Sequence, residues 1–215
     1  MDEFLIKNAS AIFALIGAVL GTTITGTITY ATKTKEAKLR ITEKLLDKKL
    51  AAHESLIDLV GIIRTSIILG GEDEHGELYR CPLIMQNRKN MDDFLALFNK
   101  VQNESDRWIS SHLKREISFF LDYFVNLNED SRGATDEALQ LVGSIVRSDF
   151  VEISLELENC AHEFFNNDML KLKYRTDREW HKYPRDVTMK KLNETDFYKN
   201  RHKVKSIFHK ENNIT

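Results

Sequence analysis

The feature that most constrains this chain is a long uncharged stretch near its N-terminus. No Asp, Glu, Lys or Arg occurs between Lys7 and Lys33, and apolar residues dominate from Ala9 to Tyr30. At about 1.5 Å per residue, a helix of this length crosses the roughly 30 Å hydrocarbon core of a bilayer. A cleaved signal peptide is the alternative, but the first residues include Asp2 and Glu3 and no small-x-small cleavage site follows. We therefore predict a retained membrane span.

The charges that flank this stretch predict its orientation. Four basic residues follow it closely, whereas the first seven residues hold two acids and one lysine. Basic residues are enriched on the cytoplasmic side of a span. We expect an N-terminus outside the cytoplasm, a transmembrane helix within residues 1–32, a cytoplasmic helical bundle over residues 33–170 and a basic C-terminal segment over residues 171–215.

Small residues recur every fourth position along the predicted span. The candidate contact residues are Gly17, Gly21, Thr22, Thr25, Gly26 and Thr29. Such rows let helix backbones approach closely, so we predict a homo-oligomer formed through this helix. In a ring of such helices the threonine hydroxyls would line a lumen. The alternative is that glycine is common in any span and that each threonine bonds back to its own helix.

Beyond the span, glycine and proline are scarce and apolar residues follow helical spacing. The chain has two prolines, nine glycines and 42% apolar residues, and its β-branched residues do not alternate with period two. These features favour an all-α fold and give strands little support. Capping residues and apolar spacing predict helices that start near Asn90, near Ser105 or Asp106, and at Thr135, the last reaching Asn167. Short connections between them indicate an antiparallel bundle.

The segment that follows the span is predicted to continue its helix. A stripe of mostly apolar residues recurs every seven positions from Leu39 to Ile67 without proline. We therefore expect a single helix about 90 Å long, at 1.5 Å per residue, that ends at Gly70 and Gly71. The next segment, residues 72–90, is acidic and contains glycine and proline, which predicts a loop.

The formal net charge is -2, but acidic and basic residues are distributed unevenly along the chain. Residues 43–168 carry 24 acidic and 13 basic side chains, whereas residues 171–210 carry 13 basic and 5 acidic ones. A basic segment can meet RNA, anionic lipid or an acidic protein surface. We expect it to lie along the acidic surface of its own or a neighbouring subunit, where Trp180, His181 and Tyr183 would anchor a subunit contact.

The chain lacks the common enzyme signatures. It has no phosphate-binding glycine loop, no GxSxG and no HExxH. Cys81 and Cys160 show neither disulfide nor zinc spacing and are expected to be reduced thiols. Cys160 with His162 is too small a pair to hold zinc. We therefore expect no metal and no cofactor.

Two arginine–histidine pairs have the Arg-x(4–6)-His spacing of HEPN ribonucleases. They are Arg107 with His112 and Arg175 with His181. In such a pair the imidazole transfers a proton and the guanidinium stabilises the phosphorane oxygens, so RNA is cleaved without metal. Such matches also arise by chance among twelve arginines and seven histidines, and Trp108 stands where these nucleases usually have a small polar residue. A structural or subunit-contacting role is therefore an open alternative for both pairs.

Together these features resemble the small membrane accessory proteins of type VI-B CRISPR systems, which carry a divergent HEPN-like motif. The resemblance rests on the N-terminal span, the charged helix LDKKLAAHESLIDL, the aromatic segment REISFFLDYFVNL and the Arg-x4-His motif. It implies a HEPN-like helical fold and a role in antiviral defence at the bacterial inner membrane, beside an RNA-guided RNA-cutting effector. Arg107 and His112, or Arg175 and His181, would carry the motif.

The resemblance also implies what the chain does and what it meets. The implied action is a homo-oligomer that permeabilises or depolarises the membrane, and the implied partners are lipid, further copies of the chain, and a CRISPR ribonuclease or RNA. The alternatives are a membrane-tethered, metal-independent ribonuclease and a non-enzymatic tether for an RNA or protein partner.

Overall fold

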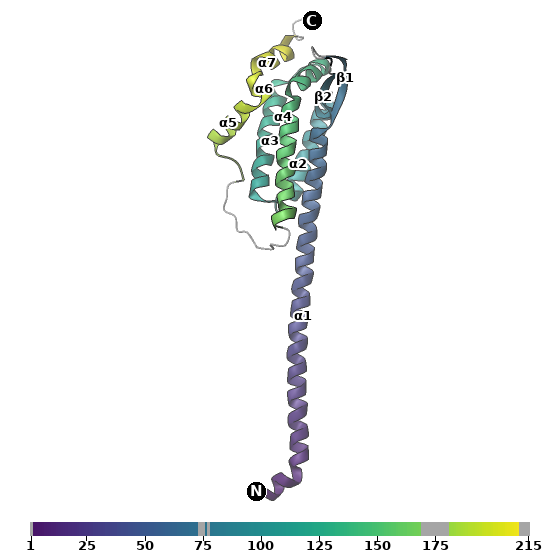
Figure 1. The fold of residues 1–215 in the computed structure, drawn as a ribbon, viewed down its shortest axis with the longest axis vertical. Coiled ribbons are helices and arrows are strands. Elements are labelled where there is room, and N and C mark those ends of the chain that lie inside the picture. The colour runs from purple at the N-terminus through teal and green to yellow at the C-terminus, as the bar shows by residue number, and fades with distance from the viewer. Residues whose placement is uncertain (1, 73–75, 77, 169–180, 211–215) are drawn as a thin grey trace. The chain divides into compact units, whose positions relative to one another are not determined.

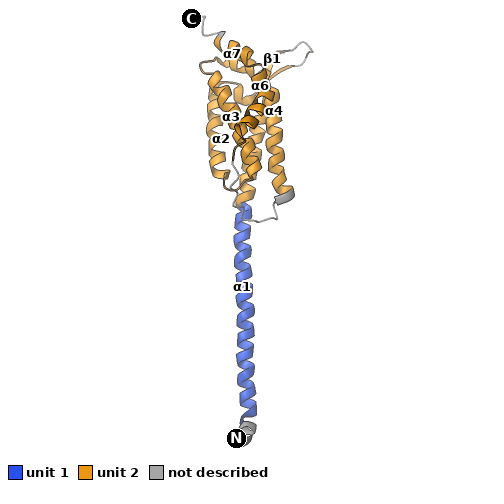
Figure 2. Cartoon of the chain, turned by 90° about the vertical axis from the view of Figure 1, so that its left-hand side faces the viewer, with its two compact units in different colours: residues 1–47 blue, residues 48–215 orange. Residues whose placement is uncertain are grey.

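The computed structural model describes residues 2–72, 76, 78–168 and 181–210. The described chain is mostly helical, as predicted, with one two-stranded sheet (Figure 1). The helices are α1 (Asp2–Arg64), α2 (Arg88–Ser105), α3 (Ser111–Asp130), α4 (Asp136–Glu163), α5 (Arg185–Glu194), α6 (Asp196–Lys199) and α7 (Arg201–Lys210), and the strands are β1 (Ser66–Glu72) and β2 (Leu78–Pro82). The chain forms two compact units, which we call the N-terminal unit (residues 1–47) and the C-terminal unit (residues 48–215) (Figure 2).

The N-terminal unit is part of one helix with large apolar side chains on its surface. α1 is continuous over 63 residues, and the division between the units falls inside it. An 18-residue window of α1 has a mean hydropathy of 1.9, and none of that window is buried. The helix is therefore long and apolar enough to cross a membrane. The crossing itself and the domain boundaries at residues 32 and 170 remain predictions.

The C-terminal unit is a helical bundle around an aromatic core. Four helices lie side by side in this unit and alternate in direction: the C-terminal part of α1, α2, α3 and α4 (Figures 1 and 2). Each helix carries an apolar stripe, and the stripes face inward because burial removes them from water. Neighbouring rings from three helices lie 5.3–6.4 Å apart between centroids; they belong to Phe94, Phe98, Phe120, Phe124 and Phe150.

A β-hairpin replaces the predicted helix end and loop. α1 ends at Arg64 rather than at Gly70 and Gly71, and β1 pairs antiparallel with β2. Ile67 fits the helical stripe by spacing, but Ile67 and Ile68 are β-branched residues that also favour extended backbone. The predictions that strands have little support and that residues 72–90 form a loop were therefore wrong in this region.

The hairpin packs closely against α4, and a glycine makes the approach possible. A Cβ atom built at Gly143 of α4 would lie 2.4 Å from Sγ of Cys81 and 3.2 Å from Cβ of Met85. Cys81 is fully buried at this contact, and burial raises the pKa of its thiol to about 12. The thiol is therefore protonated and acts as a small apolar group.

Side-chain caps set where three helices begin. Asn87 caps α2 by accepting the backbone N–H of Asn90 at 2.8 Å, so the predicted start at Asn90 was wrong by about one turn. Ser110 caps α3, later than the predicted start at residues 105–106. Thr135 caps α4, and this predicted start is confirmed. Each cap pairs a backbone N–H that has no partner inside its own helix.

The segment α5–α7 packs on the bundle of its own chain. Its buried apolar residues are Leu192, Phe197, Val204 and Phe208. Asp149 of α4 accepts the backbone N–H groups of Asp196 at 2.6 Å and Phe197 at 2.8 Å, and the hydroxyl of Tyr123 at 2.9 Å. A buried carboxylate with three donors ties the start of α6 to α3 and α4.

Ion pairs reinforce the same contact. Asp130 of α3 accepts from Arg201 at 2.7 Å and from Lys205 at 3.2 Å, and both cations hold the pKa of this carboxyl below its usual range against the opposing effect of burial. Lys191 donates to both oxygens of the buried Glu116 at 2.7 Å. The described part of the basic segment thus lies on the acidic surface of its own chain, and a contact with a neighbouring subunit remains a prediction.

A buried histidine lies at the opposite end of the bundle from the hairpin. His53 of α1 is fully buried and stacks on Phe164 at 3.9 Å between centroids. Its Nδ1 lies 2.7 Å from the carbonyl oxygen of Lys49, and its Nε2 is buried without a hydrogen-bond partner in the described chain. Burial lowers the pKa of this imidazole, so the ring is neutral near pH 7.

Candidate functional site

The residues predicted to form helix contacts all lie on the exposed surface of α1. A shallow groove on the N-terminal unit is lined by Gly21, Thr22, Thr25, Gly26, Thr29, Tyr30 and Lys33. Gly17 lies one turn before this groove. Apart from the adjacent residues and nearby backbone of α1 itself, the described chain has no atom within 4 Å of a Cβ built at Gly17, Gly21 or Gly26, so no packing contact within it requires glycine there.

The five threonines between residues 22 and 29 fall into two groups. Thr22, Thr23 and Thr27 donate their hydroxyls to carbonyl oxygens of the preceding turn at 2.7–3.0 Å. In the described chain Thr25 and Thr29 form no such bond, so their hydroxyls are available to an outside partner. The alternative that each threonine bonds back to its own helix therefore holds for the first group only.

The two residues of the first arginine–histidine pair, Arg107 and His112, lie in different surroundings. Arg107 is exposed in the turn between α2 and α3, and His112 lies in the first turn of α3 with 40% of its side chain exposed. A helix that starts at Ser105 or Asp106 would contain both residues, so this predicted start was wrong. Among the described residues no hydrogen bond joins the two side chains, and the ring of His112 instead faces α4.

The second pair is only partly described. Arg175 lies outside the described residues, and so does Trp180, which was predicted to anchor the basic segment. His181 is exposed, and its backbone carbonyl accepts the hydroxyl of Ser118 at 3.1 Å. Tyr183 donates its hydroxyl to Glu116 of its own chain, and its role in a subunit contact stays a prediction.

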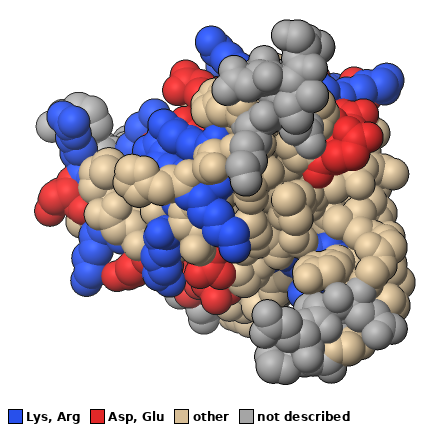
Figure 3. Space-filling view, turned by 90° about the horizontal axis from the view of Figure 1, so that it is seen from above, with Lys and Arg blue, Asp and Glu red and all other residues tan. Residues whose placement is uncertain are grey.

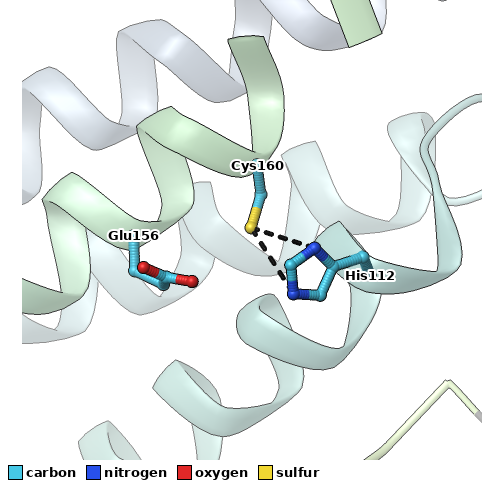
Figure 4. A group of neighbouring side chains, drawn as sticks. All are labelled: His112, Glu156 and Cys160. Atoms are coloured by element: carbon cyan, nitrogen blue, oxygen red, sulfur yellow. Dashed lines mark hydrogen bonds between the residues drawn. The ribbon is translucent and has the colours of Figure 1, made fainter. Parts of the chain in front are cut away.

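His112 belongs to a group of three side chains that the structure brings together (Figure 4). Glu156 and Cys160 come from successive turns of α4, and the ring of His112 reaches them from α3. Sγ of Cys160 lies 3.6 Å from Nδ1 and 4.0 Å from Nε2 of His112. One ligand atom from each of the three residues lies within 4.8 Å of the other two. A thiol, an imidazole and a carboxylate at these distances could hold a metal ion.

The surroundings of this group are acidic. Burial raises the pKa of the Cys160 thiol to about 12, and the nearby carboxylates of Glu156, Glu116 and Glu163 act in the same direction. Oε2 of Glu163 lies 3.5 Å from Nδ1 of His112. A protonated, buried thiol is a poor nucleophile, so the pair of Cys160 and His112 is not built for covalent catalysis.

Sequence reasoning missed this group. Cys160 was considered with His162, which instead lies 3.9 Å from Glu158 and contacts Phe165. The four-residue spacing of Glu156 and Cys160 places both on one helical face and was visible in the sequence. The approach of His112, 48 residues away, depends on how α3 packs on α4 and has no local signal.

Positive charge remains exposed on the C-terminal segment. In Figure 3 the Lys and Arg side chains gather on the left, where Figure 1 places α5–α7. The exposed cations there are Lys182, Arg185, Lys190, Lys199 and Lys203. This surface is therefore compatible with binding of RNA or another anionic partner, which remains a prediction.

Comparisons with known proteins leave the family open. No family model matches the chain, and neither a curated protein nor a solved structure matches it.

Proposed function

We propose that this chain is a membrane-anchored protein that associates with further copies of itself through α1 and thereby permeabilises or depolarises the membrane. The observation that carries the proposal is the apolar window of α1, none of which is buried in the structure. An apolar surface of this kind is stable only when something outside the chain covers it. The hydrocarbon core of a bilayer would cover the apolar window, because its thickness of about 30 Å matches about 20 helical residues.

Self-association is supported by the open glycines. Glycine within a helix costs about 1 kcal/mol relative to alanine, so unused glycines are unfavourable in a lone helix. Gly17 and Gly21 form a GxxxG pair that lets a second helix approach closely. Thr25 and Thr29 continue this row with free hydroxyls, which would hydrogen-bond across helices or face water in a lumen.

The biological setting of the proposal comes from the sequence resemblance. An oligomeric membrane protein with a cytoplasmic helical bundle suits an effector that acts in antiviral defence beside an RNA-guided ribonuclease. The ribonuclease alternative has less support, because Arg107 and His112 lie in different local environments and His112 contacts a thiol and a carboxylate. The loss of RNA cleavage in both Arg107→Ala and His112→Ala would restore that alternative.

The proposal is tested by the size and leakage activity of the full-length protein. We expect oligomers in detergent by mass photometry and release of a dye from vesicles that contain the protein. Gly21→Ile should reduce both, because a branched side chain blocks close helix approach. Gly61→Ile is the matched control: it places the same side chain on α1 outside the apolar window, at a position with nothing within 4 Å of the Cβ, and should change neither. A strictly monomeric, non-leaking protein would contradict the proposal.

A further inference from the structure

The group of His112, Glu156 and Cys160 has the composition of a zinc site. Zinc is bound in proteins by thiolate sulfur, imidazole nitrogen and carboxylate oxygen, and this group offers one of each. Magnesium and calcium prefer sites made of oxygen ligands alone, so a site with a sulfur and a nitrogen ligand suits zinc better than either of these ions. The carboxylates of Glu156 and Glu163 near Cys160 favour a divalent cation at this place.

The distances agree with this chemistry. Zn–S and Zn–N bonds of about 2.3 Å and 2.0 Å at a tetrahedral angle place the two ligand atoms about 3.5 Å apart. Sγ of Cys160 lies 3.6 Å and 4.0 Å from the two ring nitrogens of His112, within a small ring rotation of that value. The half-exposed ring has the freedom to make it.

The orientation of the ring identifies the coordinating nitrogen. Figure 4 shows the ring of His112 with one nitrogen directed to the side on which Glu156 lies. The other nitrogen, Nδ1, lies 3.5 Å from Oε2 of Glu163. This matches the usual arrangement in which a coordinating histidine donates its second N–H to a carboxylate. We therefore infer that Nε2, which lies 4.0 Å from Sγ of Cys160, is the ligand atom and that Glu163 positions the ring.

The position of the group in the bundle suits entry of an ion. Cys160 is buried, whereas Glu156 is exposed and forms no ion pair with any described residue. The nearby Glu116 is already neutralised by Lys191 and is not free to act as a ligand. The three ligands thus lie between a buried helix face and solvent, and a fourth position on the solvent side is open to water.

We propose that His112, Glu156 and Cys160 form a zinc-binding site with one open position, oriented by Glu163. The site joins α3 to α4 at the end of the bundle that contains Phe164. The proposed oligomer forms through α1, whereas the zinc ligands lie on α3 and α4. A failure to bind zinc would therefore leave the proposed oligomerisation untouched, and a monomeric protein would leave the zinc site untouched.

The test measures zinc binding by tag-free, full-length protein in detergent, against a chromophoric chelator. We expect one zinc ion per chain. Loss of a residue that only orients a zinc ligand weakens metal binding by about 10-fold to 100-fold, and we expect this for Glu163→Gln. Loss of a ligand itself should weaken zinc binding by more than about 100-fold, and we expect this for Cys160→Ser, His112→Gln and Glu156→Gln. Cys81→Ser, which changes the other buried thiol, and His162→Gln, which changes a histidine on the same helix, should bind zinc as the unmodified protein does.

Cobalt gives a second readout that does not depend on affinity. Co²⁺ in the site should show a thiolate-to-cobalt charge-transfer band, present in Cys81→Ser and absent in Cys160→Ser. Glu156 is exposed, so Glu156→Gln removes a proposed ligand without disturbing the core. Circular dichroism checks the fold of every variant. Sub-stoichiometric zinc binding, or equal binding by Cys160→Ser and the unmodified protein, would overturn the proposal.

Discussion

In the N-terminal unit Phe13 and Leu15 of α1 are 73% and 66% exposed, whereas Leu56 and Ile63 of the same helix in the C-terminal unit are 4% and 1% exposed. The residue types are similar and the backbone is the same continuous helix, but the described residues bury large apolar side chains of this helix in the C-terminal unit and leave the apolar window exposed. The C-terminal unit therefore owes its stability to its own core. The N-terminal unit has an apolar surface that no described residue buries.

The largest effect should come from placing charge on that surface. Ile16→Asp combined with Leu20→Asp adds two carboxylates near the middle of the predicted span, at about 2.5–3.5 kcal/mol each for membrane insertion. We expect the variant to leave the membrane pellet after an alkaline wash. Leu141→Asp combined with Leu155→Asp, at exposed apolar positions of α4, should stay in the pellet with the unmodified protein. Retention of the charged α1 variant would show that this helix does not cross the bilayer.

The next effect compares one substitution in the two units. Phe120→Ala removes a buried ring that contacts Phe94, Phe98, Phe124 and Phe150, and should lower the free energy of unfolding by about 3–5 kcal/mol. Phe13→Ala removes the same atoms from an exposed position, so unfolding of the C-terminal unit should be unchanged. Denaturant unfolding in detergent, followed by tryptophan fluorescence, measures both. Equal losses would mean that the N-terminal unit contributes to the same core.

A smaller effect is expected where the hairpin meets α4. Gly143→Ala places a methyl group against Cys81 and Met85, and overpacking of this kind costs about 1–3 kcal/mol. Gly61→Ala adds the same methyl group to α1 in open space and should stabilise the helix by up to about 1 kcal/mol. Opposite shifts in the midpoint of thermal unfolding are expected. A stabilising Gly143→Ala would contradict the close packing of β2 on α4.

The smallest effect concerns pH. Because burial lowers the pKa of His53 in the folded state, the unfolded chain binds a proton first as the pH falls below about 6.5. Stability should therefore be unaffected above that pH and should fall below it, by at most about 1.4 kcal/mol per pH unit. His53→Phe should flatten the stability profile between pH 6.5 and 5. An unchanged slope in that variant would assign the pH dependence to other groups.

The sequence was sufficient where the signal is local. The apolar window of α1, the helical class of most of the chain and the Thr135 cap follow from neighbouring residues, and the structure confirms each. The hairpin was missed because Ile67 fits both a helical stripe and a strand, and only pairing with β2 and packing on α4 decides between them. The group at His112 was missed for a related reason, since its members meet through the packing of two helices.

The hydrogen bonds of Asp149 have a consequence for how the chain is made. Tyr123 precedes this residue by 26 positions, but Asp196 and Phe197 follow it by 47 and 48. During synthesis the carboxyl group therefore leaves the ribosome well before two of its three donors, and the face of α4 that receives Phe197 stays open meanwhile. A chain that stops before Thr195 would keep that apolar face exposed, as a substrate for chaperones and proteases.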